Sequence, residues 1–179
     1  SCYIFADTLF ISMGIGIDGL TAINLALPIF SLVNGSGLMI GMGGGTKYTL
    51  AVSRGKQQEG NKIFTNTLYM TAIFGIVFVI LGIFFSGNIA TLLGADEQVM
   101  ANTEIYLKML LIFSPAFILN NIVQCFVRND GAPHLSMIAM IVGSMSNMFL
   151  DWLFIFPFGM GMFGAVLATC LSPVFSLIL

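Results

Sequence analysis

Residues 63–87 read IFTNTLYMTAIFGIVFVILGIFFSG, a run of 25 residues without a charged side chain. An α-helix needs about 20 mostly apolar residues to cross the hydrocarbon core of a membrane. The apolar residues are continuous rather than alternating, which favours a helix over a barrel strand. Lipid also requires every backbone polar group to find an internal partner. The stretch therefore predicts a membrane-spanning helix.

Charged residues cut the rest of the chain into pieces of similar length, so the sequence predicts six spanning helices in one lobe that covers residues 1–179. Pro28 is expected to kink the second helix. The start at Ser1 and the end inside an apolar run predict a piece of a longer protein with a clipped first helix. The predicted spans are residues 1–17, 20–48, 63–87, 103–127, 135–156 and 161–179.

Composition supports this all-α transmembrane fold. The chain is 58% hydrophobic and 8% charged, with a mean hydropathy of +0.99, whereas about a quarter of the residues in a soluble domain are charged. A net charge of -2 offers no basic patch for nucleic acid, so no nucleic-acid partner is expected. No C-x-x-C, H-E-x-x-H or G-x-S-x-G motif occurs. We therefore expect neither an enzyme nor a cofactor.

The charged residues near the helix ends predict the orientation. Basic side chains gather between the second and third spans and between the fourth and fifth, whereas Asp18, Asp96 and Glu97 lie at the opposite helix ends. The positive-inside rule then places the amino terminus in the cytoplasm of a multi-pass protein. The basic residues concerned are Lys47, Arg54, Lys56, Lys62, Arg128 and His134.

The glycine-rich stretch 41–47, GMGGGTK, superficially suggests a phosphate-binding loop. It lacks the second glycine of that motif, where Thr46 stands, and Tyr48 replaces the metal-binding Ser or Thr. Small residues recurring every four positions let two membrane helices approach closely. The pattern therefore predicts a helix-packing face made of Gly37, Gly41 and Gly45.

Two acidic residues fall inside predicted spans rather than at their ends. Asp7 lies in the first span and Asp151 in the fifth. A mid-membrane aspartate costs about 2.5–3.5 kcal/mol on insertion scales, so such residues persist mainly where they face a cavity and have a function. The alternative is that either side chain lies near an interface and reaches water. We therefore regard both carboxylates as candidate functional groups.

Asn147 stands four residues before Asp151, which puts the two side chains on one helix face. Together they offer an amide oxygen and a carboxylate, and hard cations prefer oxygen ligands. A carboxyl group that can be charged or neutral is also suited to carry a proton. The alternative for Asn147 is a hydrogen bond between helices.

Four stretches resemble the MATE (multidrug and toxic compound extrusion) transporters and are closest to their bacterial MepA- and DinF-like branch. FADTLFI at residues 5–11 resembles the acidic motif of the first helix. Residues 41–64 are similar to the region between helices two and three. QCFVRNDGAP at residues 124–133 resembles the end of helix four, and residues 138–172 resemble helices five and six.

This resemblance implies that the chain is the N-terminal lobe of a two-lobed transporter in a bacterial cell membrane. The missing C-terminal lobe and the bilayer would be its partners, and amphipathic cationic drugs its substrates. The implied activity is drug export in exchange for a proton or sodium ion. The implied cation site, with sodium as one candidate ion, consists of Asp7, Asn147, Asp151 and Thr169, with Tyr106 beside them.

Two other functions stay open at this point. A flippase for a lipid-linked precursor would need a basic cavity for phosphate groups, yet the spans contain few basic residues, and Lys47 and Lys108 sit near helix ends. A membrane subunit that transports nothing is the other alternative. Dye export driven by a proton or sodium gradient would distinguish the drug exporter from these two alternatives.

Overall fold

A computed structural model of the protein describes the backbone of residues 2–178 and the side chains of residues 7–178. Seven α-helices and no strands occur in this described part. The helices are α1 (Cys2–Gly14), α2 (Ile17–Ser53), α3 (Gln57–Leu92), α4 (Glu97–Ile112), α5 (Ser114–Asn129), α6 (Pro133–Ile155) and α7 (Gly161–Ile178).

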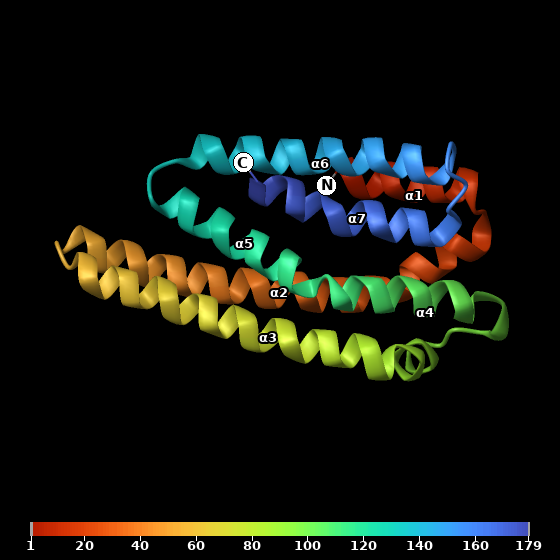
Figure 1. Ribbon diagram of the computed structural model, residues 1–179, viewed down its shortest axis with the longest axis horizontal. Coiled ribbons are helices and arrows are strands. Elements are labelled where there is room, and N and C mark those ends of the chain that lie inside the picture. Colours follow the sequence, from red (N-terminus) through yellow and green to blue (C-terminus); the bar gives the residue numbers. More distant parts are fainter. Residues whose placement is uncertain (1, 179) are drawn as a thin grey trace.

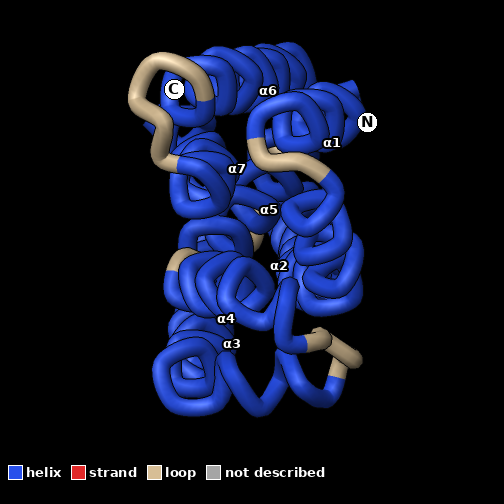
Figure 2. Tube along the Cα trace, turned by 90° about the vertical axis from the view of Figure 1, so that its right-hand side faces the viewer, coloured by secondary structure: helices blue, strands red, loops and turns tan. Residues whose placement is uncertain are grey.

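The helices form an elongated bundle with α2 near its centre (Figure 1). One group consists of α2 packed against α3, α4 and α5, and a second group consists of α1, α6 and α7. Contacts of α4 with α7, and of α5 with α6 and α7, join the groups. The end-on view shows α1 and α6 at one side of the stack and α3 at the other (Figure 2).

The α2–α3 and α3–α4 connections carry opposite charge and lie at opposite ends of the bundle. The α2–α3 and α5–α6 connections lie at one end of the bundle, and the α1–α2, α3–α4 and α6–α7 connections lie at the other (Figure 1). The first end carries Arg54 and Lys56 in the α2–α3 connection and Asp130 in the α5–α6 connection, and the second end carries Asp96. This is the separation on which the topology prediction rests, while the side of the membrane that each end faces stays a prediction.

Four helices, α2, α3, α6 and α7, are long and apolar enough to cross a membrane, and α4 with α5 would make a fifth span. Helix α1 has 13 residues, fewer than a crossing needs, so the sixth span stays a prediction. Helices α2 and α3 have 37 and 36 residues, or about 55 Å each against a hydrocarbon core of about 30 Å. Both helices are longer than the predicted ranges 20–48 and 63–87, because charged residues end a hydrophobic run without ending a helix.

The predicted span 103–127 is two helices, α4 and α5, bent by 49° at Phe113. Pro115 has no N–H to donate to the carbonyl of Leu111. The Ser114 hydroxyl donates to that carbonyl instead, at 2.7 Å, and Ser114 is fully buried. By contrast, α2 continues as one helix through Pro28, and the kink expected there stays a prediction.

The glycine face of α2 packs against α5, which confirms the prediction for Gly37, Gly41 and Gly45. A Cβ atom on Gly41 would lie 3.1 Å from the Cα of Ile122 and 3.2 Å from the Cys125 sulfur. A Cβ on Gly37 would lie 3.1 Å from the Cα of Ile118. Backbone atoms cannot move aside as a flexible side chain can, so these glycines fix the distance between α2 and α5.

We expect Gly41→Ala to destabilise the protein by about 1–3 kcal/mol, because the methyl group overpacks the α2–α5 interface. Gly43→Ala is the matched control on the same helix, since a Cβ there meets nothing within 4 Å. Removing that glycine should leave stability unchanged or raise it by up to about 1 kcal/mol. Thermal unfolding in detergent measures both variants. Equal melting temperatures for the two would contradict the packing role.

Candidate functional site

The two predicted membrane carboxylates are buried and lie near each other. Asp7 on α1 is 8% exposed and Asp151 on α6 is 0% exposed. Helices α1 and α6 pack together, and the two carboxyl groups lie close enough to interact electrostatically. Neither side chain reaches out to solvent, as the alternative reading would require.

Asn147 lies one helical turn from Asp151 and is 1% exposed. Its amide nitrogen and oxygen have no hydrogen-bond partner, and the same holds for Asp7 Oδ1 and both Asp151 oxygens. The hydrogen bond between helices that was the alternative for Asn147 is therefore not formed. Buried polar groups in proteins are normally paired. Six buried side-chain atoms lack a partner in the described part of the chain, and five of them belong to these three residues.

Tyr106 and Thr169 complete the predicted set. Tyr106 on α4 is 4% exposed and lies near Asp7, Asp151 and Thr169. Thr169 on α7 is 7% exposed, and its hydroxyl donates to the Ala165 carbonyl at 3.2 Å. The fold therefore brings all five predicted residues to one place from four helices.

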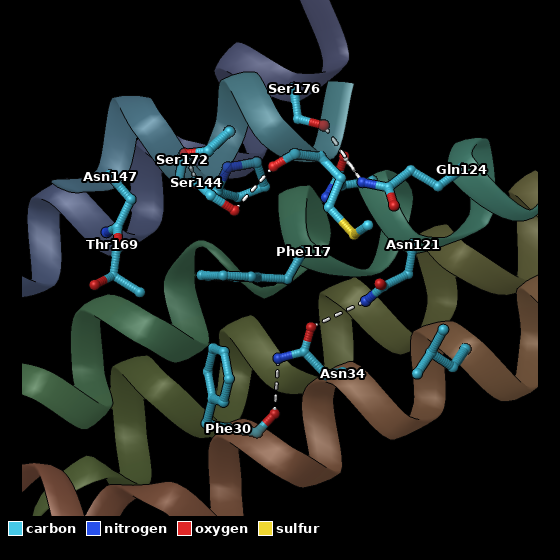
Figure 3. A pocket seen from close by; sticks show the side chains of 15 residues that line it. Phe30, Asn34, Phe117, Asn121, Gln124, Ser144, Asn147, Thr169, Ser172 and Ser176 are labelled. Atoms are coloured by element: carbon cyan, nitrogen blue, oxygen red, sulfur yellow. Dashed lines mark hydrogen bonds between the residues drawn. The ribbon is translucent and has the colours of Figure 1, made fainter. Parts of the chain in front are cut away.

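A cavity of about 380 Å³ adjoins this place, bounded by α2 and α5 on one side and α6 and α7 on the other. Asn147 and Thr169 belong to its wall and lie together at one end in the close view (Figure 3). The wall contains no charged residue. Its polar members are Asn34, Asn120, Asn121, Gln124, Ser144, Asn147, Thr169, Ser172 and Ser176.

Hydrogen bonds tie the walls of the cavity together (Figure 3). The Asn121 amide donates to Asn34 Oδ1 at 3.0 Å, which links α5 to α2. The Gln124 amide donates to the Ser176 hydroxyl oxygen at 3.4 Å, which links α5 to α7. These bonds orient neutral amides and hydroxyls toward the space, where they can solvate a polar ligand without a fixed charge.

These neutral polar residues of the cavity wall were not predicted from the sequence, apart from Asn147 and Thr169. A usable signal was present, because Asn120 and Gln124 are four residues apart, as are Ser172 and Ser176. Polar side chains at that spacing share a helix face. Uncharged amides and hydroxyls stand out less in an apolar span than an aspartate does.

The site offers oxygen donors rather than the ligands of a transition metal. Among the described residues, no group of three or more His, Cys, Asp or Glu side chains could hold a metal ion. Two carboxylates, an amide and a hydroxyl suit a proton or a hard cation. Sodium at Asp7, Asn147, Asp151 and Thr169 stays a prediction.

Comparison with known proteins supplies the family. The MatE family model matches residues 1–153, which include Asp7, Tyr106, Asn147 and Asp151 but not Thr169. The multidrug export protein MepA of Staphylococcus saprophyticus is 35% identical over 155 residues, which cover 87% of this chain and 34% of that protein. MepA of Staphylococcus aureus strain MRSA252 is 33% identical over the same length. The chain thus spans about a third of the length of these curated relatives.

Solved structures agree with this match. An inward-facing multidrug resistance MATE family transporter of the MOP superfamily superposes with a TM-score of 0.93 and 26% identity, over 98% of this chain and 40% of that one. A MOP superfamily transporter from Pyrococcus furiosus superposes with a TM-score of 0.91 and 26% identity, over 99% of this chain and 39% of that one.

The matches confirm the predicted all-α membrane fold and its likeness to one lobe of such transporters. The matched proteins are exporters and transporters rather than enzymes, as expected for this chain. With most of its length matched by the family model and its fold shared with solved transporters, this multi-pass membrane chain belongs to the MatE family.

Proposed function

We propose that this chain forms one wall of a multidrug exporter that exchanges drug for a proton or sodium ion. The observation that carries the proposal is the group of buried, unpartnered polar atoms on Asp7, Asn147 and Asp151. These atoms adjoin a neutral cavity through Asn147. The names of the MepA relatives, multidrug export proteins, support the same activity.

Like charges explain how this site would couple to an ion. Asp7 and Asp151 interact with each other and have no ion pair in the described part of the chain. Two carboxylates in a medium of low dielectric repel each other, and a proton or cation relieves the repulsion. Ion binding would therefore hold α1 against α6, because Asp7 belongs to one helix and Asp151 to the other.

Coupling requires the ion and the drug to prefer different conformations, because only differential affinity shifts a conformational equilibrium. Asn147 and Thr169 belong both to the predicted ion site and to the cavity wall. An ion that binds the Asn147 side chain would change the part of the cavity wall that a drug contacts. The drug would leave when the ion arrives, which is antiport.

The cavity favours amphipathic substrates. Phe30, Leu38, Phe117 and Met140 contribute apolar surface beside the amides and hydroxyls. A volume of about 380 Å³ lies within the range of small-molecule sites. Methionine and aromatic side chains adapt to varied ligands. We infer cationic, amphipathic drugs as the substrates, with a second lobe closing the site.

The rival functions make different demands on the same cavity. A flippase for a lipid-linked precursor needs basic groups for phosphate, and the cavity wall contains none.

We also propose that the amino terminus lies in the cytoplasm of a bacterial cell, with the chain in the cell membrane. The basic α2–α3 connection supports this orientation.

The test is flux through the full-length protein in liposomes. We expect an imposed proton or sodium gradient to drive export of a cationic dye such as ethidium. Dissipating the gradient with an ionophore should stop the export. Gradient-driven flux of a lipid-linked precursor, or no flux of either compound, would contradict the proposal.

A further inference from the structure

Two further cavities lie along the α2–α3 hairpin. An apolar groove of about 360 Å³ runs between the two helices, and a smaller basic pocket of about 170 Å³ lies toward the hairpin tip. Lys47 and Ile63 line both, so the two spaces are neighbours. None of these residues belongs to the carboxylate site or its cavity.

Gly43 leaves open space in this groove, because a Cβ atom there would meet nothing within 4 Å. The neighbouring Gly44 also lines the groove, but a Cβ atom there would clash with the Thr67 side chain of α3, so Gly44 lets α2 and α3 approach closely. Met39 and Met70 border it at the far end, and they are 67% and 49% exposed. From Met39 to Lys47 the groove follows eight residues of helix, about 12 Å. Its shape suits a flexible chain rather than a globular ligand.

The mouth of the groove carries uncompensated positive charge. Lys47, Arg54 and Lys56 line the basic pocket together with one acid, Glu59. Glu59 pairs with Lys56 at 3.1 Å, the single salt bridge in the described part of the chain. Lys47 and Arg54 therefore have no ion-pair partner and are free to bind an anion.

The position of the hairpin places this charge at the membrane surface. The apolar stretch of α2 ends near Lys47, and the hairpin tip extends beyond the other helices at its end of the bundle (Figure 1). The apolar groove thus lies at the depth of lipid acyl chains, and the basic side chains of Lys47 and Arg54 lie at the depth of lipid headgroups. Basic side chains at that level attract anionic lipids.

We propose that this groove binds one anionic phospholipid, with an acyl chain against Gly43 and the phosphate headgroup on Lys47 and Arg54. Charge complementarity selects the headgroup, and the open space beside Gly43 selects the chain. The bound lipid would fix the hairpin against the bilayer. This inference does not depend on the transport proposal.

Native mass spectrometry of the full-length protein, titrated in detergent with phosphatidylglycerol, tests the site. We expect one phosphatidylglycerol to bind more tightly than phosphatidylcholine with the same chains. Lys47→Gln and Arg54→Gln should each weaken binding about fivefold. Lys62→Gln is the matched control, because Lys62 lines neither the groove nor the basic pocket. Its effect should stay below about twofold.

The acyl half of the proposal has its own variants. Gly43→Leu fills the groove and should weaken binding at least about tenfold, since two buried methylene groups already account for that factor. Gly43→Ala should bind nearly as the parent does. Lys47→Gln changes an exposed side chain and keeps the test valid where Gly43→Leu fails to fold.

Three outcomes would overturn the lipid site. Equal binding of phosphatidylglycerol and phosphatidylcholine is the first, and it is also expected if another part of the full-length protein fills the groove. Unchanged binding in both Lys47→Gln and Gly43→Leu is the second. Displacement by millimolar glycerol 3-phosphate is the third, because it would assign the pocket to a free phosphate.

Discussion

Asp7→Asn and Asp151→Asn, introduced singly into the full-length protein, should each reduce gradient-driven dye export to the background of empty vesicles. Each change keeps the shape of the side chain and removes its ability to take up a proton or balance a cation. Because the two carboxyl groups interact across the α1–α6 contact, either one alone leaves the ion site incomplete. The dye itself should still bind, since neither acid lines the cavity.

The control for this experiment is Asp96→Asn, which removes an exposed acid from the α3–α4 connection and should export at the parent rate. Equal membrane insertion of all variants is verified by quantifying reconstituted protein. Export at the parent rate by both Asp7→Asn and Asp151→Asn would refute the coupling role. Loss of export together with loss of dye binding would instead indicate a damaged cavity.

The sequence located the carboxylates because a charge inside an apolar span is energetically costly and easily seen. Helical spacing added Asn147, since a residue four positions from Asp151 must share its face. No spacing rule relates Thr169 or Tyr106 to these residues, because they come from other helices whose packing is long-range. Those two entered through family resemblance alone, and the structure places them beside the acids.

The break between α4 and α5 illustrates what hydropathy cannot reveal. Pro28 and Pro115 both stand inside apolar runs, yet only the second accompanies a broken helix. At Pro115 the neighbouring Ser114 hydroxyl satisfies the freed carbonyl, and α3 approaches through Gly75, whose added Cβ would lie 3.1 Å from the proline ring. The break is therefore stabilised by the rotamer of a hydroxyl group and by the packing of a neighbouring helix. The presence of a proline in the sequence specifies neither of these.

Stability and transport should move in opposite directions in Asp151→Leu. Leucine branches at Cγ as aspartate does, so it fills a similar shape without the two buried oxygens that lack partners. Replacing buried ionic groups with apolar groups of similar volume is often neutral or stabilising, by up to about 4 kcal/mol. We expect Asp151→Leu to stabilise the protein by about 1–3 kcal/mol, the usual cost of an unpaired buried polar group, while export is lost.

Thermal unfolding in detergent, without added sodium, measures this gain. Leu107→Ala is the control for the assay, because Leu107 is fully buried and apolar. Its truncation should destabilise the protein by about 2–5 kcal/mol. A melting temperature for Asp151→Leu well below that of the parent would mean that the carboxylate holds the fold together. The proposal requires the reverse, since a side chain retained for an ion that comes and goes lowers stability whenever the ion is away.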